Sequence, residues 1–206
     1  GNSALAGQAI SLLLTALVVS AGVQAGIERL SRWALPLLFL LLVALAIWAS
    51  TLPGAMDGYR TFLLRWDGME LMNITTIRNA FTQAFFSIGT GIGSIMAYSA
   101  YLNRKAPVPQ EAVSVVGLDT AVGLLAGMLT FPVVISFGLG DAVSESTIGT
   151  IFLALPTGLA SIGETGRIVA VAFFSLAYLA AITSSVSLLE VPVASLMDRL
   201  NCCLLY

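Results

Sequence analysis

Three groups of residues in this sequence have types and spacings suited to binding a small ion or ligand. In the first group, Gly89, Gly91 and Gly93 alternate inside a membrane-length apolar segment, next to the hydroxyls of Ser87 and Thr90. Each glycine weakens a helix by about 1 kcal/mol relative to alanine, so this spacing predicts a broken helix. A broken helix frees carbonyls for a cation and a half-helix N-terminus for a carboxylate. The alternative is close packing of intact helices through small residues.

The second and third groups are a lone acid and a cluster of hydroxyls in two other apolar segments. Asp119 is the only charge deep in its segment, and a carboxylate at the bilayer centre costs about 2.5–3.5 kcal/mol. We expect it to face a cavity, an ion or a partner, unless it lies at a helix end. Thr183-Ser184-Ser185 and Ser187 offer oxygen ligands for a hard cation, or hydroxyls that join packed helices. Glu190 is expected to join a network on the cytoplasmic side.

The composition indicates an integral membrane protein. Of the 206 residues 58% are hydrophobic and 10% are charged, whereas soluble domains carry about 25% charged residues. The net charge of −2 argues against nucleic acid as a partner, and the lack of histidine excludes sites built on that residue. We find no nucleophile–base pair and no metal-binding cluster in the sequence, so we do not expect an enzyme.

The ends of the chain carry little information about function. Cys202 and Cys203 are adjacent and fit neither a disulfide framework nor a zinc pattern. They are either lipidation sites at a cytoplasmic helix end or part of a loose tail. The first residues lack the basic cluster of a signal peptide. Because the sequence starts with Gly1 rather than methionine, it is open whether the chain is a fragment.

The apolar segments predict about five membrane-spanning helices in a single transmembrane domain over residues 1–206. A helix needs about 20 apolar residues to cross a bilayer, and no alternating strand pattern is seen. The predicted spans are about 4–23, 33–52, 77–102, 112–139 and 168–197.

The loops between these spans indicate an orientation. Short basic loops at 26–32 and 103–105 are expected on the cytoplasmic side, which places the N-terminus outside and the C-terminus inside. The long loop 140–167 then lies outside. Its short apolar segment, 151–159, predicts a surface or re-entrant helix that acts either as a lid or as a plain connector.

In order and spacing, a series of motifs resembles the neurotransmitter:sodium symporter family in its bacterial branch. The similarity covers nearly the whole chain and corresponds to roughly the fourth to eighth transmembrane helices of that fold. It implies an all-α membrane protein, part of a leucine-transporter-type inverted-repeat bundle with a broken helix. The motifs are Gly26-Ile27-Glu28-Arg29, Pro36 with Leu38-Phe39, Thr51-Leu52-Pro53-Gly54-Ala55, Gln83-Ala84-Phe85-Phe86-Ser87 with Gly91 and Gly93, Ala97-Tyr98 with Tyr101, Ala126-Gly127 with Phe131, and Thr183-Ser184-Ser185.

This resemblance implies a substrate pocket and ligands for two sodium ions. Ser87 matches both a pocket residue and a ligand of the first ion, and Asp119 stands where the family usually has an asparagine that binds that ion. Segment 141–165 matches the extracellular loop that caps the vestibule. The other matching pocket residues are Phe86, Gly89, Ile92 and Leu188, and the ligands of the second ion are Ala180, Thr183 and Ser184.

The resemblance also suggests how selective the pocket is and which ions it uses. Gly89 and Ile92 stand where many relatives have bulkier residues, which favours larger apolar or aromatic amino acids. Many animal relatives bind chloride beside the first sodium ion. The carboxylate of Asp119 would supply that negative charge, which predicts chloride-independent transport. Alternatively, Asp119 exchanges a proton as the empty carrier returns.

Three functions therefore remain open at the level of sequence. The first is part of a sodium-coupled symporter of amino acids or related small amines in the inner (plasma) membrane. Its partners would be the substrate, lipid and the remaining helices of the same transporter, because the family's first and third helices have no counterpart in this chain. The second is a proton-coupled amino-acid permease of the same general fold. The third is a non-transporting structural membrane fragment.

Overall fold

The structure, a computed structural model, describes residues 2–65, 68–99, 101, 107–139, 152 and 155–200. In these residues every regular element is a helix, which confirms the predicted all-α class. Helices long and apolar enough to cross a membrane are Ser3–Ser20, Ala25–Ser50, Val108–Ser136 and Glu164–Met197.

The first two long helices are joined by a π-helical segment instead of a loop. Helix α1 (Asn2–Ser20) is followed by η1 (Val23–Glu28) and α2 (Arg29–Ser50). The helix thus begins before residue 33, the predicted start of the second span, which stays a prediction. A run of apolar residues marks only the part of a helix that is compatible with lipid. The polar turn before it is also helical, and the ion pair between Arg32 and Glu28, at 2.8 Å, stabilises it.

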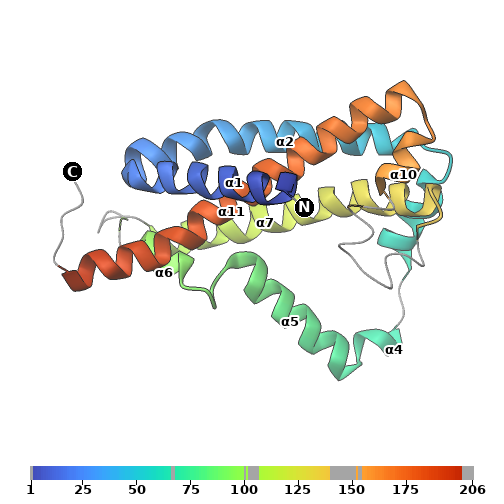
Figure 1. Cartoon of the computed structure of the whole chain (residues 1–206). Helices are drawn as coiled ribbons and strands as arrows, with labels where there is room; N and C mark the ends of the chain where they lie inside the picture. The colour runs from blue at the N-terminus through green and yellow to red at the C-terminus, as the bar shows by residue number, and fades with distance from the viewer. Residues whose placement is uncertain are drawn as a thin grey trace. The chain divides into compact units, whose positions relative to one another are not determined.

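The remaining helices follow in order along the chain (Figure 1). Two of the long ones, α7 and α11, continue through internal prolines, Pro132 and Pro192 respectively. The bounds are α3 (Ala55–Tyr59), η2 (Arg60–Leu64), α4 (Gly68–Leu71), α5 (Ile74–Ile88), α6 (Ser94–Ser99), α7 (Val108–Ser136), α10 (Leu155–Ala160) and α11 (Glu164–Leu200).

The chain divides into two compact units, which we describe separately. Unit 1 consists of Gly1–Leu37, Arg78–Val115 and Tyr178–Tyr206, and unit 2 of Leu38–Ile77 and Val116–Ala177. Helices α2, α5, α7 and α11 contribute residues to both units.

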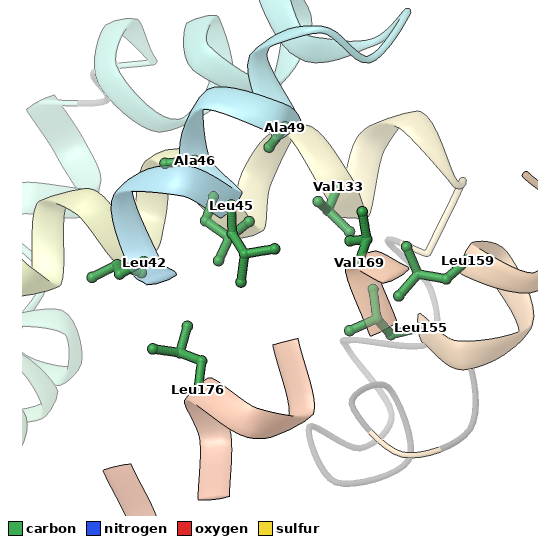
Figure 2. Packing of buried hydrophobic residues seen from close by; sticks show 10 residues of the cluster. Leu42, Leu45, Ala46, Ala49, Val133, Leu155, Leu159, Val169 and Leu176 are labelled. Carbon is green, nitrogen blue, oxygen red and sulfur yellow. The ribbon is translucent and has the colours of Figure 1, made fainter. Parts of the chain in front are cut away.

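Unit 2 has a purely apolar core (Figure 2). Since lipid tails are as apolar as leucine, close van der Waals packing is the main force available to hold such a cluster within a bilayer. One close approach needs glycine: a Cβ on Gly58 of α3 would lie 2.6 Å from the Cα of Pro132 in α7. The core residues are Leu42, Leu45, Ala46 and Ala49 of α2, Leu129 and Val133 of α7, Leu155 and Leu159 of α10, and Val169 and Leu176 of α11.

Unit 1 has a smaller buried cluster formed by Val19, Ile27 and Val186. These residues come from α1, η1 and the second half of α11. The aromatic ring of Tyr98 in α6 packs against this cluster. The cluster therefore links the N-terminal helix to the part of α11 that carries the predicted site residues.

Parts of the sequence-based organisation stay predictions. Within the long loop 140–167, a short helix at Leu155–Ala160 partly matches the expected segment 151–159, but its role as lid or connector is open. The predicted third span, 77–102, contains two shorter helices, so the count of five spans is also open. Residues 103–105 and Cys202 and Cys203 lie outside the described residues.

Candidate functional site

The predicted helix break is present. Helix α5 ends at Ile88 and α6 begins at Ser94, as two separate helices in Figure 1. Gly89 and Gly93, at the two ends of the break, have φ angles of +75° and +87°. This left-handed conformation costs a residue with a Cβ about 1–2 kcal/mol, which explains the glycines. The alternative of an intact helix packed through small residues is wrong here.

Local hydrogen bonds define both edges of the break. The amide of Gly89 donates to the carbonyls of Phe85 and Phe86, both at 3.1 Å, and this closes α5. The amide of Ala97 donates to the carbonyl of Gly93 at 2.9 Å and starts α6. The break is thus a defined turn between two helices.

The predicted pocket residues all belong to unit 1. Phe86 and Ser87 lie in the last turn of α5, Gly89 and Ile92 lie in the break, and Leu188 lies in α11. The three apolar side chains are well exposed: 68% for Phe86, 40% for Ile92 and 47% for Leu188. They are therefore available to contact a ligand or further helices.

The oxygens predicted to bind the second sodium ion converge on one turn of α11. The hydroxyls of Thr183 and Ser184 both donate to the carbonyl of Ala180, each at 3.0 Å. Thr183 also lies 3.1 Å from the carbonyl of Leu179. Each hydroxyl uses its hydrogen within the helix and keeps oxygen lone pairs that can coordinate a cation.

The chemistry of this donor set fits a monovalent hard cation. Neutral hydroxyl and carbonyl oxygens bind such ions, whereas transition metals favour imidazole and thiolate ligands. Among the described residues, no group of three or more His, Cys, Asp and Glu side chains could hold a metal ion. A single turn could supply only part of a coordination shell, so a cation bound there would need further ligands from other segments.

Helix α6 and the second half of α11 lie side by side within unit 1. The hydroxyl of Tyr98 donates to Ser187, and that of Tyr101 donates to a carboxyl oxygen of Glu190, both at 3.0 Å. Glu190 is only 3% exposed. Glu190 thus belongs to a hydrogen-bonded pair, and neither tyrosine was predicted as a partner of α11. The sequence offered one signal for these contacts. Tyr98 and Tyr101 are three residues apart, and so are their partners Ser187 and Glu190.

Asp119 lies well inside α7, about three turns from its first residue, Val108. The alternative of an acid at the helix end is therefore wrong for this helix. Its side chain is half-buried and belongs to unit 2.

Comparison with known proteins identifies the family of this chain. The model of the sodium:neurotransmitter symporter family matches residues 4–205. The chain belongs to this family. An uncharacterized sodium-dependent transporter of Bacillus subtilis, YhdH, is 37% identical over 93% of the chain and 41% of its own length. A second, from Methanocaldococcus jannaschii, is 34% identical over 91% of the chain and 39% of its own length.

Animal proteins are also similar. The sodium-dependent nutrient amino acid transporter 1 of Drosophila ananassae is 30% identical over 78% of the chain and 26% of its own length. The chain thus spans about two fifths of the length of its bacterial and archaeal relatives. Family membership confirms the predicted family resemblance. Because the family and these relatives are sodium-dependent transporters, it also confirms the expectation that the chain is not an enzyme.

Proposed function

We propose that this chain forms part of a sodium-coupled amino-acid symporter of the plasma membrane, the inner membrane of a bacterium. One observation carries the proposal: three oxygens of Ala180, Thr183 and Ser184 gather on one turn of α11, in the same unit as the helix break. Lipid and the remaining helices of the same transporter are the proposed partners.

The break and its neighbours supply chemically distinct parts of the proposed pocket. Phe86, Ile92 and Leu188 offer apolar surface for an amino-acid side chain. Ser87 is proposed to contact both the substrate and the first sodium ion. A residue that contacts both sodium and the substrate couples their two binding equilibria. Sodium then raises the affinity for the substrate by the same factor as the substrate raises the affinity for sodium.

The residues at the break also support a preference among amino acids. Gly89 has no side chain and Ile92 is smaller than phenylalanine, so the proposed pocket favours larger apolar and aromatic substrates. Competition binding to the full-length protein should rank leucine, methionine and the aromatics above glycine and alanine. A ranking with glycine first would contradict this part of the proposal.

Uptake of a labelled amino acid into proteoliposomes, under an imposed sodium or pH gradient, tests the proposed function. The full-length protein should accumulate a labelled amino acid under an inward sodium gradient at symmetrical pH. Uptake driven by a pH gradient and independent of sodium would instead favour the proton-coupled permease. A folded protein that takes up nothing under either gradient would favour the non-transporting alternative.

A further inference from the structure

We propose that Tyr98 and Ser187 are positioning residues that tie α6 to the sodium-binding turn of α11. Through them, occupancy of the ion site would be transmitted to the broken helix. This inference rests on the proposed function, because it adds a coupling element to the same sodium site.

Hydrogen bonds that meet at Ser187 and at Thr183 support this inference. The hydroxyl of Tyr98 donates to Ser187 Oγ at 3.0 Å, and Ser187 Oγ donates to the carbonyl of Thr183 at 3.1 Å. The Thr183 hydroxyl in turn donates to the carbonyl of Ala180 at 3.0 Å. Ser187 both accepts and donates, so the two bonds through its hydroxyl polarise and strengthen each other.

Packing restricts the hydroxyl of Tyr98 to this arrangement. The Tyr98 ring packs against the cluster of Val19, Ile27 and Val186, and Val186 is only 1% exposed. Tyr98 and Ser187 are themselves half-buried. Because both residues are partly shielded from water, losing either partner would leave a polar group less well hydrogen-bonded.

The position of α6 allows this hydrogen-bonded contact to couple the ion site to the helix break. Helix α6 begins directly after the break, whose end residues Gly89 and Gly93 have left-handed backbones. A shift of the Thr183 carbonyl on ion binding would move Ser187 and, through it, Tyr98. The turn between the glycines allows α6 to follow that shift while α5 stays in place. Ion binding at α11 and the shape of the break then form one coupled equilibrium.

Substrate binding to the full-length protein, measured as a function of sodium concentration, tests the role of the contact between Tyr98 and Ser187. Tyr98→Phe keeps the packed ring, and Ser187→Ala removes only a hydroxyl. Each variant should raise the half-saturating sodium concentration about 3–10-fold, and the double variant should be no worse than the stronger single one. Ser187→Thr, which restores a hydroxyl, should recover most of the sodium affinity.

Ser185→Ala is the matched control. Ser185 donates to the carbonyl of Ala181 at 3.0 Å, which is the same type of bond on the same helix, but it is exposed. It should leave the sodium dependence unchanged. Two results would overturn the inference: unchanged sodium dependence in both single variants, or loss of substrate affinity that persists equally at saturating sodium.

The combined variant Thr183→Val with Ser184→Ala separates this inference from the proposed function. If that variant keeps the wild-type sodium dependence, the proposed sodium site itself fails. If it loses sodium affinity while the Tyr98 and Ser187 variants do not, only the coupling role fails.

Discussion

At the scale of single residues, the acid in α7 is the feature that most distinguishes the proposed ion chemistry. The family resemblance predicts that Asp119 stands where the family usually has an asparagine that binds the first sodium ion, and we propose that Asp119 binds this ion. An ionised carboxylate at that position would supply a negative charge, so a second anion nearby would meet like-charge repulsion.

We therefore expect transport by the full-length protein to be the same in gluconate as in chloride. Asp119→Asn removes the charge at nearly constant size, and this variant should acquire chloride stimulation. Strong chloride stimulation of the wild type would contradict the prediction. Proton antiport with turnover that depends on pH, lost in the same variant, would favour the alternative role in proton exchange.

The pair of Tyr101 and Glu190 gives a stability prediction at this scale. Tyr101→Phe removes the hydroxyl that donates to the buried carboxyl group of Glu190. Leaving a buried acceptor with one donor fewer costs about 1–3 kcal/mol, so the detergent-solubilised protein should melt at a lower temperature. Tyr178→Phe, at a tyrosine that is 44% exposed, is the control. Equal losses in both variants would count against a specific role for the pair.

The residue-scale contacts differ in how far the sequence could predict them. Thr183 and Ser184 follow Ala180 by three and four residues, so a helix alone brings both hydroxyls to its carbonyl. The contact of Tyr98 with Ser187 depends on the course of the chain between α6 and α11. Local sequence does not determine that course.

At the scale of elements, the break between α5 and α6 follows from backbone conformation. Gly89→Ala and Gly93→Ala each force a Cβ into a left-handed backbone and should lower transport activity. The strain is about 1–2 kcal/mol per site. Gly91 lies between them without a positive φ, and a Cβ there would meet nothing within 4 Å.

Gly91→Ala is therefore the matched control for the two strained sites. Measurements of uptake rate, normalised to folded protein, should separate it from the Gly89 and Gly93 variants. If all three alanines were tolerated equally, the left-handed turn would not be required for function.

The contact of α3 with α7 gives a second prediction at this scale. A Cβ on Gly58 would approach backbone atoms of Pro132, which cannot rotate away as a side chain could. Gly58→Ala should destabilise the protein by about 1–3 kcal/mol in thermal unfolding. Gly68→Ala, where a Cβ would meet nothing within 4 Å, should leave the melting temperature unchanged.

The existence of the long helices was predictable because each contains an apolar stretch that could cross a bilayer. Their ends were less predictable, since α2, α7 and α11 continue into polar residues that an apolar window does not include. The break was predictable because alternating glycines disfavour a helix. The packing of α10 in the core of unit 2 depends on residues distant in sequence and could not be predicted from local pattern.

At the scale of the whole molecule, we expect the proposed sodium dependence to need more helices than this chain contains. The chain covers about two fifths of the length of its bacterial relative. The oxygens proposed to bind sodium on α11 would supply only part of a coordination shell. We therefore expect ion and substrate binding only in the full-length protein, with the ligands of α11 as a necessary part of the site.

Equilibrium binding of an amino acid as a function of sodium concentration tests this account most directly. The full-length wild type is compared with the combined variant Thr183→Val and Ser184→Ala, and with Ser185→Ala as control, with choline replacing sodium. The combined variant should weaken sodium-dependent binding by about tenfold or more, roughly 1.4 kcal/mol, while the control keeps the wild-type curve. An unchanged sodium affinity in a combined variant that melts like the wild type would contradict the proposed sodium site.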